Sequence, residues 1–319
     1  MKPLGQLFVV TPVYEDMEAC SQLFRRLREE LGSRLFVVAV DDGSVKQPLS
    51  ASVISDQGAQ GVVLKLRRNV GHQRAIAIGL TYVAEHVDDV DSVVVMDSDG
   101  EDLPETVASL LEQLTHPNVD VVVAQRRSRI ESVRFKAFYV VYKSLFNLLT
   151  GRSISFGNFM ALKSAAVKRL AAMQETTIHV AGSVLASKLR TSLCPLDRGP
   201  RYAGRSKMNF VGLALHGFKG LMVFAEDVLV RVGITCAAIA GASLIGIVAA
   251  IVLKLLGFST PGWFSVALGI LVLMLMQTGA LSLMTLMLTG VVRSGSVSSI
   301  ISYQDFVETE MYTDRAEAT

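Results

Sequence analysis

Two aspartates, Asp97 and Asp99, directly follow the apolar run of residues 93–96. The run is typical of a buried strand, and the alternation of side chains along a strand would put both carboxylates on the same side. Two carboxylates this close repel each other unless a cation neutralises them, and oxygen ligands suit a hard ion such as Mg²⁺ or Mn²⁺. The simplest partner for such a site is a metal-bound phosphate. Acidic pairs also occur as solvated turn residues, so the surrounding elements must decide between these two interpretations.

Short apolar runs alternate with helical stretches over the first part of the chain. The runs predict strands at 7–10, 36–40, 62–66, 93–96 and 121–124, and the stretches between them include helices at 19–31, 74–86 and 104–114. Strands that are apolar on both faces and separated by helices are typical of a mostly parallel sheet covered on both sides. The sequence therefore predicts an α/β nucleotide-binding architecture.

A polar cluster follows each of the five predicted strands. The clusters lie at 11–15, 41–44, 67–71, 97–99 and 125–127. In open parallel sheets, ligands bind outside the carboxyl ends of the strands. Five clusters at five such ends favour a binding site much more strongly than one acidic pair does.

With its motifs in this order, the chain resembles the family-2 glycosyltransferases with a GT-A fold. Within that family it resembles the polyprenyl-phosphate sugar synthases, which act on dolichyl or undecaprenyl phosphate. The resemblance covers nearly the whole chain and is weakest at residues 45–60 and after Val292. The motifs that carry it are TPVYE at 11–15, DDGS at 41–44, RNVGHQRA at 68–75, MDSDGEDLPE at 96–105 and RYAGRSK at 201–207.

The resemblance implies a Rossmann-like, mostly parallel GT-A sheet and a role for each group of motif residues. For the nucleotide sugar it implies Thr11, Pro12, Tyr14, Glu15, Asp41, Asp42, Asn69, Asp97 and Ser98. For the cofactor, Mg²⁺ or Mn²⁺, it implies Asp97, Asp99 and Glu101. For the acceptor phosphate or the donor diphosphate it implies Arg201, Ser206 and Lys207, and for catalysis Asp99, Arg126 and Asn158.

Several positions depart from the family pattern. Glu101 and Leu103 stand where the family commonly has Gln and Pro, and His72 stands where relatives often place a lysine. Asn158 stands where the family usually has an acidic residue that activates the acceptor. Because the second pKa of a phosphate monoester is about 6, the acceptor needs positioning more than deprotonation. We expect Asn158 to orient it by hydrogen bonding; the alternatives are another carboxylate or an unusual use of the acceptor.

Two long stretches near the C-terminus, 232–253 and 261–292, contain no Asp, Glu, Lys or Arg. Each is long enough to cross a bilayer, which needs about 20 helical residues, although a buried hairpin of a soluble core is an alternative. Basic residues precede the first stretch and follow the second, whereas only Lys254 lies between them. The distribution of positive charge predicts two spans with both termini in the cytoplasm. The first residues lead straight into an apolar strand, which predicts no signal peptide.

These observations predict four regions. They are a cytoplasmic GT-A catalytic domain at 1–207, an interfacial helix at 208–231, a transmembrane region at 232–292 with helices at about 232–254 and 262–292, and a cytoplasmic tail at 293–319. An alternative for the interfacial helix is packing against the globular domain. The expected location is the bacterial inner membrane.

The resulting hypothesis is an inverting, metal-dependent transferase that moves one sugar from a UDP-hexose to polyprenyl phosphate at the cytoplasmic face. Its partners are then the nucleotide sugar, the lipid and the membrane, with no nucleic acid, and the resemblance suggests a homo-oligomer. A processive synthase would show a Q-x-x-R-W motif, but Trp263, the single tryptophan, lies in the second apolar stretch. The remaining rival is a catalytically silent membrane scaffold that binds nucleotide sugar.

Overall fold

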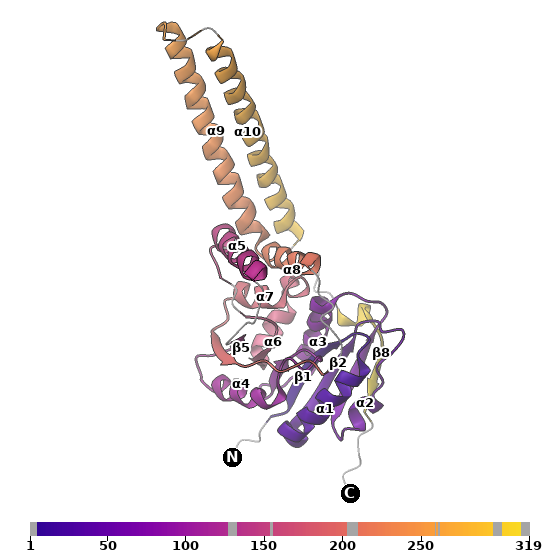
Figure 1. Cartoon of the computed structure of the whole chain (residues 1–319). Helices are drawn as coiled ribbons and strands as arrows, with labels where there is room; N and C mark the ends of the chain where they lie inside the picture. Colours follow the sequence, from indigo (N-terminus) through magenta and orange to yellow (C-terminus); the bar gives the residue numbers. More distant parts are fainter. Residues whose placement is uncertain are drawn as a thin grey trace. The chain divides into compact units, whose positions relative to one another are not determined.

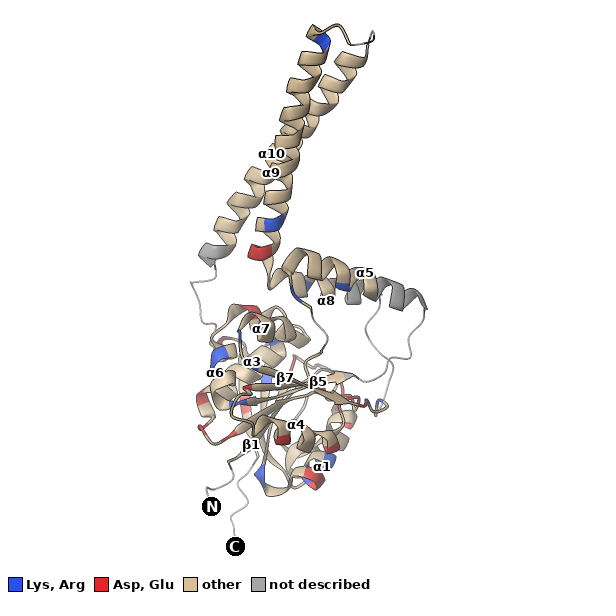
Figure 2. Ribbon diagram, turned by 90° about the vertical axis from the view of Figure 1, so that its left-hand side faces the viewer, with Lys and Arg blue, Asp and Glu red and all other residues tan. Residues whose placement is uncertain are grey.

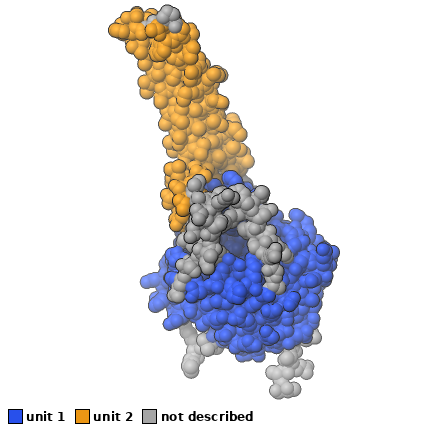
Figure 3. Space-filling model, viewed as in Figure 1, with its two compact units in different colours: residues 1–139, 154–223, 300–319 blue, residues 140–153, 224–299 orange. Residues whose placement is uncertain are grey.

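The computed structural model describes residues 5–126, 133–153, 156–202, 210–258, 260, 262–295 and 302–313 (Figure 1). The chain divides into two compact units (Figure 3). The first, here called the sheet unit, comprises residues 1–139, 154–223 and 300–319. The second, here called the hairpin unit, comprises residues 140–153 and 224–299. Each unit is described by itself.

The sheet unit is built on a mixed sheet that is mostly parallel. Its strands are β1 (Leu7–Val13), β2 (Leu35–Asp41), β3 (Gln60–Leu66), β4 (Ser92–Val95), β5 (Val121–Arg126), β6 (Met160–Lys163), β7 (Thr191–Leu196) and β8 (Val307–Tyr312). They lie in the order β7-β5-β6-β4-β1-β2-β3-β8. Among these described strands, only β6 and β8 run antiparallel to their neighbours. The α/β prediction is confirmed, and all five predicted strands are present.

Helices cover both faces of the sheet because successive strand residues point to opposite sides. The alternate residues Val9 and Val37 pack with α1 (Met17–Leu31), α2 (Ser52–Ser55) and α4 (Val107–Leu114). Val10 and Val38 pack on the other face with α3 (His72–His86), α6 (Ser164–Ala171) and α7 (Val180–Ala186). The double cover explains why the strands are apolar on both faces.

The last strand was not predicted. β8 lies in residues 293–319, which were predicted to form a cytoplasmic tail. It pairs antiparallel with β3. The hydroxyl of Tyr82 in α3 donates to that of Tyr312 in β8 at 3.2 Å. The chain therefore leaves the sheet unit after residue 223 and returns to it to supply an edge strand.

The hairpin unit contains two long helices, α9 (Ala225–Leu255) and α10 (Trp263–Gly295), which pack along each other. Small residues allow close contact: the Ser282 hydroxyl donates to the carbonyl of Gly233 at 3.2 Å, and Leu271 lies against Gly246. By length and composition, both helices could cross a membrane. Figure 2 shows that charged residues are absent along most of both helices.

The region between the sheet and the first long helix differs from the prediction. The expected interfacial helix ends early, as α8 (Phe210–Met222), and residues 225–231 already belong to α9. Leu215, Phe218 and Met222 of α8 are exposed, which fits one apolar face at helical spacing. Helix α5 (Val133–Thr150) follows β5, and Phe146, one of its described aromatic side chains, is buried.

Candidate active site

Those predicted site residues that the structure describes lie at the carboxyl end of the sheet, where the strand order reverses between β1 and β4. Such a switch point is where open α/β sheets bind ligands. The backbone N–H of Met96 donates to the carbonyl of Val10 at 3.1 Å, and the Ser98 hydroxyl donates to the carbonyl of Pro12 at 3.2 Å. These bonds hold the loop after β4, here called the acidic loop (residues 97–103), beside the end of β1.

Asp97 and Asp99 lie close enough to influence each other. Burial raises the pKa of Asp99, and the neighbouring charge of Asp97 raises it further. A divalent cation would relieve this repulsion, and carboxylate oxygens are the ligands that Mg²⁺ and Mn²⁺ prefer. The pair therefore fits a hard cation. Within the described part of the chain, no group of three or more His, Cys, Asp or Glu side chains is gathered to hold a metal.

Glu101, predicted as a third metal ligand, is paired with arginines in this structure. One of its carboxylate oxygens accepts from the Arg201 Nε at 3.1 Å, and the other forms an ion pair with Arg198. Arg201 also pairs with Asp99, at 2.9 Å from Nη2 to Oδ2. The arginines of this region therefore act on the acidic loop itself, a role that the sequence did not suggest.

The two aspartates after β2 organise the loops around them. The Asp41 carboxylate is fully buried and accepts from the backbone N–H groups of Ser44 and Leu49, at 2.9 and 3.0 Å. The Asp42 carboxylate accepts from the N–H groups of Val70 and Gly71, at 2.7 and 3.0 Å, and so joins this loop to the start of α3. Both were predicted to read the nucleotide; here their oxygens are occupied by the protein backbone.

Glu15 has a similar structural role. Its carboxylate accepts from the N–H groups of Val45, Lys46 and Gln47 at 2.8 to 3.1 Å, and these bonds lower its pKa. Its own backbone has φ of 48°, a region that residues other than glycine seldom adopt. The strained turn directs this carboxylate onto the loop that follows β2.

The remaining predicted residues differ in what they can offer. Thr11 and Pro12 are buried in β1, whereas Tyr14 and Asn69 are exposed and can meet a ligand. Arg126 ends β5, where its backbone pairs with Leu196. The side chain of Arg126, and all of Ser206 and Lys207, lie outside the described residues.

His72 is a site residue whose importance was underestimated from the sequence. It begins α3, and its Nε2 lies 3.3 Å from Asp97 Oδ1 and 3.1 Å from the Asn158 amide nitrogen. Burial opposes protonation of His72, but the contact with Asp97 and the charges of Asp99 and Asp102 together raise its pKa. The contact with Asp97 is an ion pair when the ring is protonated, and the hydrogen bond at Nε2 is made with the Asn158 amide. In this geometry the Asn158 NH₂ faces the ring nitrogen, and the donor and acceptor roles depend on the tautomer of His72. Two of the departures from the expected pattern, His72 and Asn158, are thus in direct contact.

A pair of histidines, His179 and His216, connects α8 to the start of α7. His179 precedes α7, and its Nδ1 accepts from the Gly182 N–H at 2.9 Å. The neutral ring then carries its proton on Nε2, which lies 3.2 Å from His216 Nε2 in α8. Burial lowers the pKa of His179 to about 3, helped by His216 and Lys219. This contact shows that one face of α8 packs on the globular part, the alternative that the sequence left open.

We expect the buried His179 to make the sheet unit unstable in acid. The imidazole has a pKa of about 6.5 when unfolded but about 3 when folded, so the unfolded chain binds the extra proton between these values. The free energy of unfolding should fall as the pH drops from about 6.5 towards 3, by at most about 1.4 kcal/mol per pH unit from this residue. His179→Asn keeps the capping acceptor and should flatten this slope. Unfolding followed by circular dichroism against pH measures it, with the exposed His116→Asn as control; an unchanged slope in His179→Asn would contradict the assignment.

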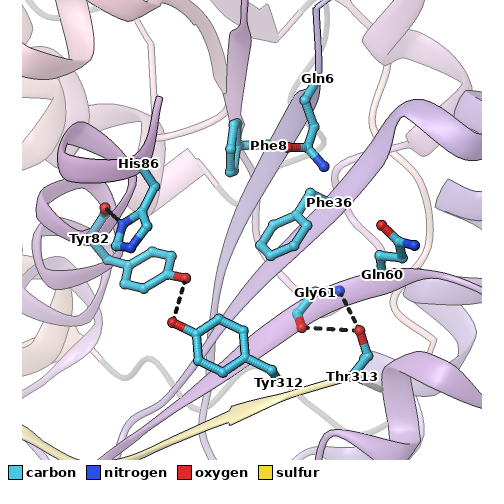
Figure 4. A pocket seen from close by; sticks show the side chains of 9 residues that line it. All are labelled: Gln6, Phe8, Phe36, Gln60, Gly61, Tyr82, His86, Tyr312 and Thr313. Atoms are coloured by element: carbon cyan, nitrogen blue, oxygen red, sulfur yellow. Dashed lines mark hydrogen bonds between the residues drawn. The ribbon is translucent and has the colours of Figure 1, made fainter. Parts of the chain in front are cut away.

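A cavity of about 440 Å³ lies at the opposite end of the sheet (Figure 4). Its lining includes Phe8 and Phe36, near the beginnings of β1 and β2, together with Tyr82 and Tyr312. The predicted site residues follow the ends of these strands. This cavity is therefore separate from the candidate active site.

Comparisons with known proteins agree with the architecture of the fold. The chain is 26% identical over 284 residues to an uncharacterized glycosyltransferase from Synechocystis sp., covering 84% of this chain and 85% of that protein. It is 26% identical over 220 residues to the undecaprenyl-phosphate 4-deoxy-4-formamido-L-arabinose transferase of Salmonella paratyphi B, covering 66% of this chain and 65% of that protein, slightly less than two thirds.

A solved structure and a family model also match the chain. Mannosyl-3-phosphoglycerate synthase from Rubrobacter xylanophilus matches with a TM-score of 0.50 and 17% identity, covering 69% of this chain and 72% of that one, a likeness of fold alone. Residues 8–172 match the family described as glycosyl transferase family 2. This match spans more than half of the 319 residues. The chain therefore belongs to glycosyl transferase family 2, and the resemblance noted in its motifs is confirmed.

Proposed function

We propose that this glycosyltransferase moves a single sugar from a nucleoside diphosphate donor, a UDP-hexose, to a polyprenyl phosphate at the cytoplasmic face of the bacterial inner membrane. The observation that carries the proposal is the combination, in one chain, of an acidic loop at a GT-A switch point with two helices apolar enough to span a bilayer. The curated relative that acts on undecaprenyl phosphate supports the choice of acceptor.

The donor side of the site is assigned to the acidic loop. Asp97 and Asp99 would hold Mg²⁺ or Mn²⁺, which would neutralise the diphosphate as it departs. We leave Glu101 out of the ligand set, because both of its oxygens are paired with arginines. Tyr14 and Asn69 are the exposed candidates for contacts with the nucleotide. We retain Arg126 as a proposed partner of the diphosphate.

The acceptor side is assigned to Asn158 and His72. An oxygen of the acceptor phosphate attacks the anomeric carbon, the bond from that carbon to the donor diphosphate breaks, and the nucleoside diphosphate leaves with the electron pair, so the carbon is inverted. An acceptor that is already an oxyanion needs no general base. The Asn158 amide, which lies beside His72, would position that phosphate by hydrogen bonding.

The path of the chain supports this orientation in the membrane. The sheet unit contributes residues on both sides of the two long helices in sequence, because β8 follows α10 and pairs with β3. One folded unit cannot occupy both faces of a bilayer, so α9 and α10 would cross it as a pair. The basic residues outside the pair favour the cytoplasmic face for the sheet unit.

A transfer assay tests the proposal. The full chain in detergent is incubated with Mg²⁺ or Mn²⁺, undecaprenyl phosphate and each common radiolabelled nucleotide sugar, and the organic extract is counted. We expect label in the lipid phase with one donor, dependent on both the metal and the lipid. Mass spectrometry of the product then identifies the sugar. If a nucleotide binds but no donor yields labelled lipid, the scaffold function replaces this one.

A further inference from the structure

A short segment after β7, here called the strap (residues 197–202), is bound along the acidic loop. The backbone N–H of Gly199 donates to the carbonyl of Glu101 at 3.0 Å, and that of Tyr202 donates to the carbonyl of Asp99 at 2.9 Å. The side chain of Leu103 lies so close to Gly199 that an added Cβ would come within 2.5 Å of it. The strap and the acidic loop are therefore in contact through their backbones as well as their side chains.

The strap also brings positive charge onto the carboxylates. Arg201 bridges two of them, with Nη2 at 2.9 Å from Asp99 and Nε at 3.1 Å from Glu101. Arg198 pairs with the other oxygen of Glu101. The guanidinium of Arg201 thus neutralises the same aspartate that is proposed to bind the metal.

Tyr202 fixes the end of the strap. Its ring lies against Gly100, whose φ of +88° few other residues adopt, and an added Cβ there would come within 2.7 Å of the ring. The Tyr202 hydroxyl accepts from Arg26 at 3.0 Å, and Arg26 forms an ion pair with Glu105 at 2.8 Å. Gly199 and Tyr202 therefore anchor the strap on either side of Arg201.

We propose that Arg201 is a built-in competitor of the metal ion: it occupies Asp99 when no metal is bound, and metal binding releases its guanidinium to bind phosphate oxygens. The proposal deepens the proposed function and rests on it. A guanidinium 2.9 Å from Asp99 repels an incoming divalent cation, so one must leave when the other binds. Once released, the arginine can form paired hydrogen bonds with a phosphate.

The exchange has a consequence for the order of binding. Without metal, Arg201 is neutralised by Asp99 and Glu101 and has little attraction for anions. With metal and donor bound, the Nη2 group released from Asp99 becomes available to the phosphates. A phosphate should therefore bind more tightly to the metal-loaded protein than to the protein without metal.

Removing the competitor should strengthen metal binding. In the full chain in detergent, Arg201→Gln should lower the Kd of Mn²⁺, measured by the paramagnetic resonance of free Mn²⁺, by about fivefold, the effect of removing one partly screened ion pair. The matched control is Arg190→Gln, which removes an arginine paired with Asp120 at 2.6 Å away from the acidic loop. Unchanged or weaker Mn²⁺ binding by folded Arg201→Gln would overturn the proposal.

A second measurement needs no variant. In the wild-type protein, arginine labelling by p-hydroxyphenylglyoxal is followed by mass spectrometry. Saturating Mg²⁺ should at least double the labelling rate of Arg201, because its guanidinium is released from Asp99. The labelling rate of Arg190 should stay unchanged. Equal rates at Arg201 with and without Mg²⁺ would contradict the release. Neither readout requires sugar transfer, so a failed transfer assay with these results intact would reject the proposed function and leave the competition standing.

Discussion

Asp99→Asn is expected to abolish sugar transfer, reducing turnover by about a thousandfold or more. The substitution keeps the size of the side chain but removes the negative charge that the proposed metal requires. It also removes the partner of Arg201, whose Nη2 lies 2.9 Å from Asp99 Oδ2. Turnover is measured with the radiolabelled donor and undecaprenyl phosphate, and Mn²⁺ binding is measured in parallel.

The loss should be specific to chemistry. Asp99→Asn should insert into membranes and unfold near the wild-type temperature. The raised pKa of Asp99 shows that its charged form is unfavourable in the folded protein, so removing the charge should not destabilise the fold. The matched control is Asp89→Asn, since the Asp89 side chain is 95% exposed and pairs weakly with Lys168 at 3.7 Å. Undiminished turnover in Asp99→Asn would remove this aspartate from the metal site.

The sheet and its site edge could be predicted from sequence because both depend on local patterns. Strand residues such as Val9 and Val10 are buried on opposite faces, and this double burial produces apolar runs that are easily recognised. The polar clusters follow the same strands, so their meeting at one edge required only that the strands be parallel. The hairpin was predictable for a similar reason, since length and apolar composition are properties of a single segment.

The partners of individual side chains could not be predicted in this way. Asp42 lies in a motif that the family uses, yet its oxygens bind the N–H groups of Val70 and Gly71. Glu101 meets Arg201, 100 residues away in sequence, and His72 meets Asn158, 86 residues away. Such contacts depend on how distant loops approach each other, and no local spacing encodes that approach. β8 was missed for the same reason, because an edge strand is defined by its neighbour.

The chain nevertheless carries signals that could have pointed to some of these contacts. His72 and Asn158 both stand where the resemblance implies charged residues, and two such changes in one site suggest that the residues touch. Gly100 lies within the acidic loop and has φ of +88°. A glycine in such a loop indicates either a tight turn or close approach by another segment, and here the segment is the strap.

The second large effect is expected from Gly100→Ala. The added methyl group would lie within 2.8 Å of several ring atoms of Tyr202, so the ring must move and take the strap with it. Displacement of the strap by about 1 Å would move Arg201 away from the phosphates and should reduce turnover by about a hundredfold. Steady-state assays measure the turnover, and circular dichroism confirms that the fold is retained.

Backbone strain alone would also disturb a glycine with positive φ, so the control must carry the same strain without the contact. Gly32 has φ of +63° and no atom within 4 Å of an added Cβ. Gly32→Ala should therefore lose about 1 kcal/mol of stability and keep its activity, whereas Gly100→Ala should lose both. Equal activity in the two variants would show that the position of Tyr202 is irrelevant to transfer. A loss confined to Gly100→Ala, partly reversed by Tyr202→Ala in the same chain, would assign the effect to the contact between the ring and the acidic loop.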